Sequence, residues 1–145
     1  TAERRHKSRH RYGYEHGNVR EVFEMKLVYI CSPLRGEPEK NIAKANEYAR
    51  EEAMKGNCAI APHCVFTQFL NDEVPDERWL GQEMGKALLC RCDELLVCGS
   101  IISEGMREEI KIAYENGITV LGRDLSIADI EDAVFGETEQ CCEMV

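Results

Sequence analysis

The sequence predicts an α/β domain built around a parallel sheet. Its 145 residues are enough for one domain with a hydrophobic core, and 43% of them are apolar, which is close to the average of globular proteins. Short apolar runs alternate with longer segments in which apolar residues recur every three or four positions. Buried strands that alternate with amphipathic helices in this way form parallel sheets with right-handed crossovers.

The first two strands are predicted over residues 26–32, KLVYICS, and 58–62, CAIAP, because both runs are short and apolar. Between them, residues 38–55 are predicted as a helix that begins with Pro38, a residue suited to a first helical turn. A longer irregular stretch then leads to a second helix, predicted over residues 77–92.

The third and fourth strands are predicted over residues 94–99, ELLVCG, and 118–122, ITVLG, with a helix over residues 104–116 between them. A last helix begins after Ser126, whose hydroxyl can cap it, and runs through Phe135. Ligands of parallel sheets bind at the carboxyl ends of the strands. The loops that follow the first three strands are therefore the places where a site is expected.

Charge divides the chain into three parts. Residues 1–24 hold six of the 18 Lys and Arg and four of the 27 Asp and Glu, and we interpret them as a basic, solvated extension. Residues 25–136 form the predicted domain, and residues 137–145 form an acidic tail with adjacent Cys141 and Cys142. Domain and tail keep 12 basic and 23 acidic residues, so nucleic acid is not an expected partner. The alternative is that the basic extension is an arm that binds nucleic acid.

Several classes of protein are not expected from this sequence. No run approaches the roughly 20 apolar residues that span a bilayer, and the N-terminus lacks a secretory apolar stretch, so we expect a cytoplasmic protein without a membrane partner. None of the eight cysteines belongs to a CxxC pair. Cys90 and Cys92 lie about 200° apart on a helix and cannot share a metal ion, so no metal site is expected.

The loop CSPLRG after the first strand offers groups that can hold a phosphate. Ser32 supplies a hydroxyl, Arg35 supplies a guanidinium, and Gly36 lets the backbone approach a ligand closely. The loop matches neither the GxGxxG pattern nor the Walker pattern. The alternative is an ordinary strand-to-helix turn with an exposed arginine.

The second loop contains His63, the only histidine after residue 24. Its ring can contact a ligand or bond to a backbone carbonyl, and position alone does not decide between the two. Three aromatic residues of the same region can stack on a base or sugar, or can pack the loop against the domain: Phe66, Phe69 and Trp79.

Gly81 and Gly85 lie four residues apart on one face of the predicted second helix. Each glycine costs a helix about 1 kcal/mol relative to alanine, so something is expected to approach that face closely. The candidates are another helix, a second subunit or a ligand, and we expect another helix. A dimer face on these glycines would make the chain a structural or interaction domain.

The stretch SEGMREEI opens the helix that follows the third strand. Ser103 can cap this helix, and Gly105 leaves the first backbone N–H groups open to an anion. Glu104 and Glu108 are expected to be surface charges that compensate the helix dipole. Glu109 follows Gly105 by four residues and shares its face, so it can reach a sugar attached to a phosphate bound there. A carboxylate beside an anomeric carbon is typical of glycosyl transfer and hydrolysis.

The motifs YICSPLRG and SEGMREEIKIA resemble the nucleoside 2-deoxyribosyltransferase-like superfamily. The resemblance covers most of residues 26–122 and is closest to the 2′-deoxynucleoside 5′-phosphate N-hydrolases. It implies a Rossmann-like (flavodoxin-type) three-layer α/β sandwich with a parallel sheet of four to five strands. It also implies a homodimer or higher homo-oligomer, a small-molecule nucleotide as ligand, and no metal or organic cofactor.

The resemblance also implies roles for individual residues. Glu109 falls on the catalytic glutamate that attacks C1′ of the deoxyribose, and Tyr29 falls on an active-site tyrosine near the sugar. The remaining implied residues would bind the nucleotide, through the first loop, the base contact and the 5′-phosphate site: Ser32, Leu34, Arg35, Gly36, His63, Ser103 and Gly105.

One position departs from the family pattern. The family places an aspartate that assists proton transfer eight residues before the opening Asp of the third strand, and here that position holds Gly85. Acids of the preceding loop are candidates to replace it: Asp72, Glu73, Asp76 and Glu77. The expected function is hydrolysis or transfer at the base–sugar bond of a (deoxy)nucleoside 5′-monophosphate or related nucleotide. The alternative is a protein that binds a nucleotide without cleaving it.

Overall fold

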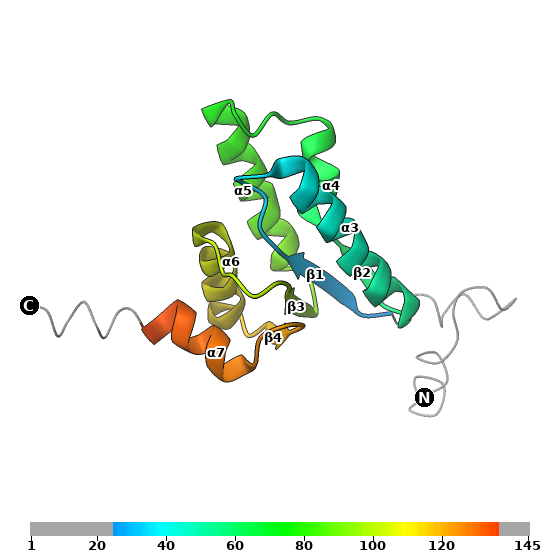
Figure 1. Cartoon of the computed structure of the whole chain (residues 1–145), viewed down its shortest axis with the longest axis vertical. Helices are drawn as coiled ribbons and strands as arrows, with labels where there is room; N and C mark the ends of the chain where they lie inside the picture. Colours follow the sequence, from blue (N-terminus) through cyan, green and yellow to red (C-terminus); the bar gives the residue numbers. More distant parts are fainter. Residues whose placement is uncertain (1–24, 137–145) are drawn as a thin grey trace, which may run out of the picture.

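The computed structural model describes residues 25–136, so the interpretations of residues 1–24 and 137–145 lie outside it. Its sheet has four parallel strands in the order β2-β1-β3-β4, which confirms the predicted α/β class (Figure 1). The strands are β1 (Leu27–Cys31), β2 (Cys58–Ile60), β3 (Glu94–Val97) and β4 (Thr119–Gly122).

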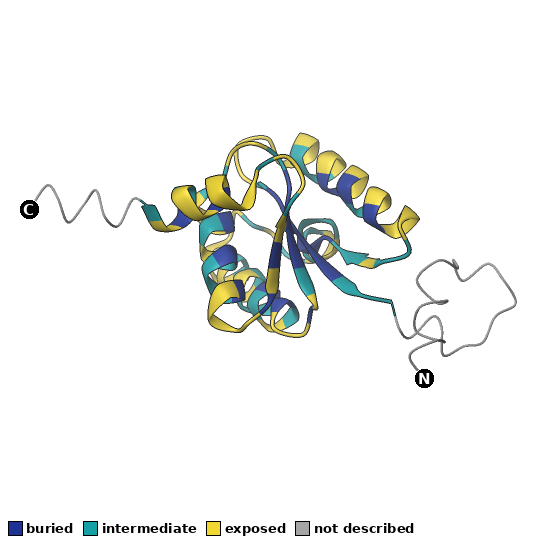
Figure 2. Cartoon of the chain, turned by 90° about the horizontal axis from the view of Figure 1, so that it is seen from below, coloured by how far each residue is buried: buried dark blue, intermediate teal, exposed yellow. Residues whose placement is uncertain are grey.

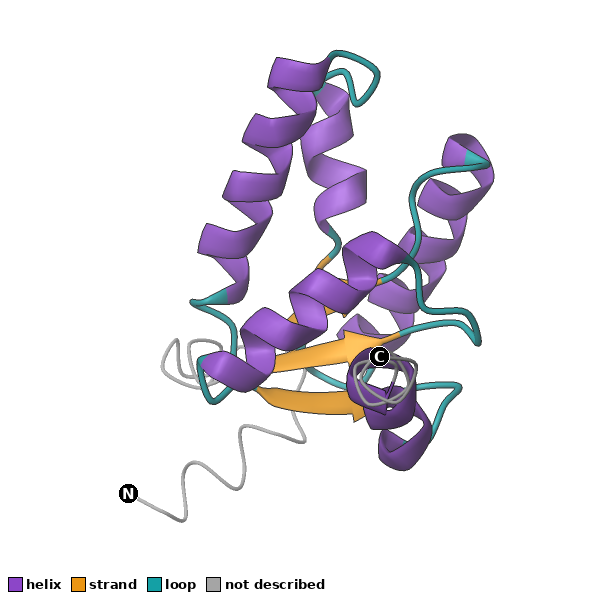
Figure 3. Cartoon of the chain, turned by 90° about the vertical axis from the view of Figure 1, so that its left-hand side faces the viewer, coloured by secondary structure: helices purple, strands orange, loops and turns teal. Residues whose placement is uncertain are grey.

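Helices cover both faces of the sheet and complete a Rossmann-like three-layer arrangement (Figure 3). One face packs against α3 (Pro38–Met54). The other face packs against α5 (Pro75–Leu89), α6 (Glu104–Glu115), α7 (Ile127–Glu131) and the π-helical turn η2 (Asp132–Gly136). Figure 2 shows buried strands between helices whose outer sides are exposed.

Strand β1 divides its side chains between the two cores. Tyr29 and Cys31 lie in the core under α5 and α6, whereas Val28 and Ile30 lie in the core under α3. This alternation follows from the two-residue period of a strand. Tyr29 pairs in register with Leu95 of β3, so its side chain lies at the middle of the sheet and directed toward α5 and α6.

The segment between β2 and α5 differs from the prediction. Strand β2 ends at Ile60 instead of residue 62, because Pro62 starts a short helix, α4 (Pro62–Val65), and η1 (Phe66–Gln68) follows it. Helix α5 begins at Pro75, a proline in the first helical turn, and ends at Leu89 instead of residue 92. The stretch predicted as irregular is therefore partly helical.

The structure also places Cys58 and bears on metal sites and membrane spans within the described residues. Cys58 is exposed, although its apolar run suggested a buried side chain. Within residues 25–136, no three His, Cys, Asp or Glu side chains are grouped so that they could hold a metal ion. In the same part of the chain, no helix combines the length and the apolar character needed to cross a membrane.

Candidate active site

A cleft of about 550 Å³ lies at the carboxyl edge of the sheet, between the loop after β1, helices α4 and α5, and the start of α6. Eight of the nine residues proposed from the sequence line it: Tyr29, Ser32, Leu34, Arg35, His63, Ser103, Gly105 and Glu109. Gly36 does not line it. Its φ of +99° shows instead that it forms the turn before α3, a backbone conformation that favours glycine.

Glu109 and Tyr29 form the centre of the cleft. The Tyr29 hydroxyl donates a hydrogen bond to the Glu109 carboxylate. Burial and, to a smaller extent, the charge of Glu108 raise the pKa of Glu109, and the hydrogen bond from Tyr29 lowers it, so that the pKa is about 7. The pKa of Tyr29 lies well above its usual range, because the side chain is buried and faces the Glu109 carboxylate. At neutral pH the phenol is therefore the donor in this pair.

Gly85 of α5 makes room for the Tyr29 hydroxyl. A Cβ atom at position 85 would lie 3.2 Å from the Tyr29 Oη. That separation is tighter than an ordinary van der Waals contact, so a side chain there would press on the phenol. The resemblance implies an aspartate at position 85. In this chain the Tyr29 hydroxyl lies in the space that the side chain of such an aspartate would begin to fill.

The expected packing of another helix against Gly81 and Gly85 is wrong. A Cβ atom at Gly81 would meet only the Leu70 side chain, at 3.6 Å, and Gly85 faces Tyr29 of the central strand. Both glycines line the cleft. Their lack of side chains therefore leaves space for the cleft instead of for a neighbouring helix.

The start of α6 has the predicted capped form. The Ser103 Oγ accepts a hydrogen bond from the Met106 backbone N–H at 3.3 Å. A Cβ atom at Gly105 would meet nothing within 4 Å, so the first turn is open toward the cleft. A capped N-terminus with open N–H groups favours an anionic ligand group.

His63 bonds to the loop after β1. Its Nε2 lies 2.9 Å from the Ser32 carbonyl oxygen, and because a carbonyl only accepts, Nε2 carries the proton. Burial lowers the pKa of His63, and the bond to Ser32 opposes this only in part. The bond to a backbone carbonyl, one of the two roles expected for His63, is therefore present. The ring also lines the cleft, so the second role, contact with a ligand, stays a prediction.

Two of the four candidate replacement acids line the cleft, namely Asp72 and Glu77, whereas Glu73 and Asp76 do not. Asp72 forms an ion pair with the first loop, with its Oδ2 at 3.7 Å from the Arg35 Nε. The Glu77 Oε1 accepts a hydrogen bond from the Asn71 backbone N–H at 3.2 Å. The segment between β2 and the first turn of α5 thus brings two carboxyl groups to the cleft, although the helix has none at Gly85.

Sequence reasoning missed three polar residues of α5 that line the cleft: Arg78, Gln82 and Lys86. They recur every four residues, and the spacing of Gly81 and Gly85 follows the same helix face. This repeat is the signal that could have identified them. Two of the three are cations, and the Lys86 Nζ lies 3.0 Å from the Glu83 carboxylate.

Two glutamates and three aromatic residues named from the sequence can also be placed relative to the cleft. Glu104 and Glu108 are exposed, as surface charges are, but they also line the cleft. Phe66 lines the cleft and makes an edge-to-face contact with Phe69, with ring centroids 6.2 Å apart. Trp79 is 60% exposed and does not line the cleft, so among the three aromatic residues only Phe66 is placed to stack on a ligand.

Comparison with known families gives one match. The model of a domain of unknown function (DUF7768) matches residues 26–123, which is more than half of the chain. No curated protein matches the sequence. The matched segment includes every residue that lines the cleft.

Proposed function

We propose that this chain, which belongs to the DUF7768 family, cleaves the base–sugar bond of a nucleotide. The observation that carries this proposal is the interaction between the buried Tyr29 hydroxyl and the partly buried Glu109 carboxylate, set in the cleft beside the open first turn of α6. The carboxylate lies on the same helix as the proposed anion site, so a bound nucleotide phosphate would place its sugar near Glu109. The substrate we propose is a (deoxy)nucleoside 5′-monophosphate or a related nucleotide.

The reaction would proceed in two displacements. The Glu109 carboxylate attacks C1′, the C1′–N bond breaks, and its electron pair goes to the base, which takes a proton from a nearby acid. Water, or the base of an acceptor in a transferase, then attacks C1′ and releases Glu109 as a carboxylate. The proton that the attacking group loses goes to the carboxylate of the acid that protonated the first base, which restores that acid. Tyr29 keeps the carboxylate oriented during both steps and stabilises its charged form.

Proton transfer to the base would come from a second carboxyl group of the cleft. Asp72 and Glu77 are the acids available there, and general acid catalysis is worth about 10²–10⁴ in rate. Glu77→Gln and Asp72→Asn would each remove the exchangeable acid proton with little change in shape. The variant whose rate of base release falls more identifies the donor.

Chromatographic assay of base release from deoxynucleoside 5′-monophosphates tests the proposal. Wild type is expected to release the base, and Glu109→Gln is expected to lose at least about 10³-fold in rate, because the variant lacks the nucleophile. Glu115→Gln is the matched control, since Glu115 lies on the same helix, is exposed and does not line the cleft. Equal rates in wild type and Glu109→Gln would rule out the proposed role.

A second candidate function is nucleotide binding without cleavage, and Gly85 favours it because it holds the position at which the family pattern places the acid that assists proton transfer. Thermal-shift measurements against a nucleotide panel separate the two, because a ligand of the folded state raises the melting temperature whether or not it is cleaved. Binding without base release, weakened by Arg35→Ala, would support this second function. The homodimer implied by the resemblance stays a prediction, which the mass of the protein in solution would test.

A further inference from the structure

A second, smaller hollow lies beside the cleft, on the α3 side of the same sheet edge. It has a volume of about 180 Å³ and lies between the first half of α3 and the loop 99–101 that follows β3. Ser32 lines both the cleft and the hollow, so the two are neighbours at the end of β1. Nothing in the proposed glycosidase reaction uses this hollow.

The Ser32 hydroxyl is the first indication of a ligand. Ser32 is 2% exposed, and its Oγ has no hydrogen-bond partner among the residues that the structure describes. Ser32 follows the last residue of β1 and lines the hollow. A buried hydroxyl without a partner is unfavourable, so an acceptor or donor in the hollow would complete its bonding.

Two lysines supply the second indication. Lys40 and Lys44 lie one turn apart on α3, and both line the hollow. The Lys40 Nζ is 3.5 Å from the Glu37 carboxylate. Among residues 25–136 no carboxylate lies within ion-pair distance of Lys44, although its charge helps to lower the pKa of Asp124. Two lysines against the single glutamate of the lining make the hollow positive, in a part of the chain where acidic residues outnumber basic ones.

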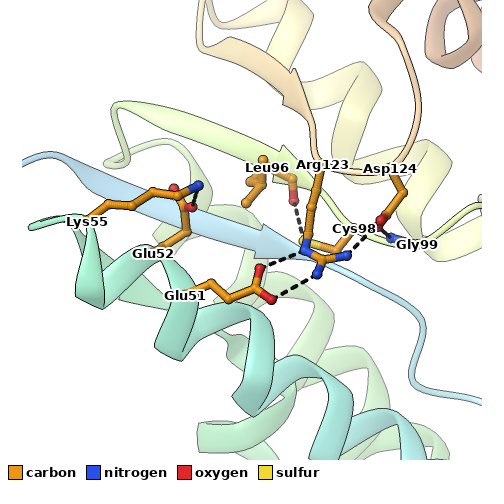
Figure 4. Close-up of polar contacts among 8 residues, drawn as sticks. All are labelled: Glu51, Glu52, Lys55, Leu96, Cys98, Gly99, Arg123 and Asp124. Atoms are coloured by element: carbon orange, nitrogen blue, oxygen red, sulfur yellow. Dashed lines mark hydrogen bonds and ion pairs between the residues drawn. The ribbon is translucent and has the colours of Figure 1, made fainter.

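The wall of the hollow is fixed by an ion-pair network (Figure 4). The Arg123 guanidinium bonds to both Glu51 oxygens at 2.7 and 2.8 Å and to Asp124 at 2.6 Å, and it stacks over Tyr48 at 4.7 Å. Asp124 in turn accepts the Gly99 backbone N–H at 2.6 Å. Arg123 is therefore saturated by carboxylates, and it positions Tyr48 and the loop at Gly99 without being available to a ligand.

We propose that this hollow binds a phosphate-sized oxyanion, held by Lys40 and Lys44 and by the Ser32 hydroxyl. The two ammonium groups would supply charge-assisted hydrogen bonds, and the Ser32 Oγ–H would donate to a third oxygen. The anion is either free phosphate or a phosphoryl group of a nucleotide that reaches over Ser32 from the cleft. The proposal stands on the hollow alone and does not require that the chain cleave a glycosidic bond.

Titration of the ¹⁵N-labelled protein with inorganic phosphate, followed by amide chemical shifts, tests this site. Saturable shifts are expected at Lys44 and at residues 99–101, and Lys40→Gln and Lys44→Gln are each expected to weaken the binding about tenfold. Arg50→Gln is the matched control, because it removes one charge from the exposed side of the same helix and does not line the hollow. Ser32→Ala should also weaken phosphate binding without loss of folded signal.

The source of the anion follows from the same titration with a nucleoside monophosphate and a nucleoside diphosphate. If the phosphate belongs to a nucleotide, the nucleoside diphosphate changes the amide shifts of residues 99–101 and those of Ser103 and Gly105 in one binding phase. Lys44→Gln then weakens the binding of the diphosphate. If free phosphate is the ligand, only inorganic phosphate shifts the hollow. The proposal is overturned if no ligand shifts residues 99–101, or if Lys44→Gln binds phosphate as tightly as Arg50→Gln does.

Discussion

The Tyr29 hydroxyl donates a hydrogen bond to the Glu109 carboxylate, and Gly85 leaves the space that this hydroxyl occupies. Strand β1, helix α5 and helix α6 thus meet at one pair of polar atoms. The pair combines a carboxyl group whose pKa is raised to about 7 with a phenol that stays protonated. Shifted pKa values are common at functional sites, and the predictions below follow from this pair.

Glu109→Gln should stabilise the fold in a pH-dependent way. The pKa of Glu109 is about 7 in the folded chain and 4.5 as its ordinary value, so the unfolded chain loses this proton first as pH rises. Wild-type stability therefore falls between about pH 4.5 and 7, by up to about 3 kcal/mol, and the variant escapes this loss. Urea unfolding of wild type and Glu109→Gln at pH 4.5 and 7.5 measures the difference in stability between the two proteins at each pH. A difference between the two proteins that does not grow with pH would contradict the burial of Glu109.

Tyr29→Phe should raise the pKa of Glu109 further, because the hydrogen bond from Tyr29 is the interaction that lowers it. If Glu109 must be ionised to react, the rise of the base-release rate with pH should move to a higher pH in the variant. Carboxyl ¹³C shifts followed against pH would measure the pKa directly. An unchanged titration of Glu109 would show that the two side chains do not interact in solution.

Gly85→Ala should disturb the pair, whereas Gly81→Ala should not. Alanine favours a helix interior by about 1 kcal/mol over glycine, so Gly81→Ala is expected to raise the free energy of unfolding by that amount. At Gly85 the new Cβ would press on the Tyr29 Oη at 3.2 Å, which offsets the gain and weakens the bond to Glu109. Unfolding measurements on the two variants make the comparison, and an equal gain would remove the steric role of Gly85.

Ser103→Ala and Ser126→Ala should cost similar stability, about 1 kcal/mol each, because both hydroxyls cap helices. Only Ser103 lies at the cleft, so only Ser103→Ala is expected to weaken nucleotide binding as well. Melting temperatures with and without nucleotide separate the two effects. If both variants lost ligand stabilisation equally, the start of α6 would not be the anion site.

The α/β class and the four strands were predictable because short apolar runs and helix-spaced apolar residues differ clearly in period. Helix α4 and η1 were not, because elements of three or four residues have no measurable periodicity. The proximity of Glu109 to Ser103 and Gly105 followed from positions within one helix. The contact between Tyr29 and Gly85 could not be predicted, because it joins a strand to a helix more than 50 residues away through tertiary packing.

Trapping of the sugar on Glu109 tests the central proposal most directly. A nucleotide with fluorine at C2′ destabilises the oxocarbenium-like transition states, so the glycosyl-enzyme should accumulate and be seen by intact mass and peptide mapping. The account predicts an adduct of one sugar phosphate on Glu109, absent in Glu109→Gln and present in Glu115→Gln. Release of the base without any adduct on Glu109, or an adduct that persists in Glu109→Gln, would contradict it.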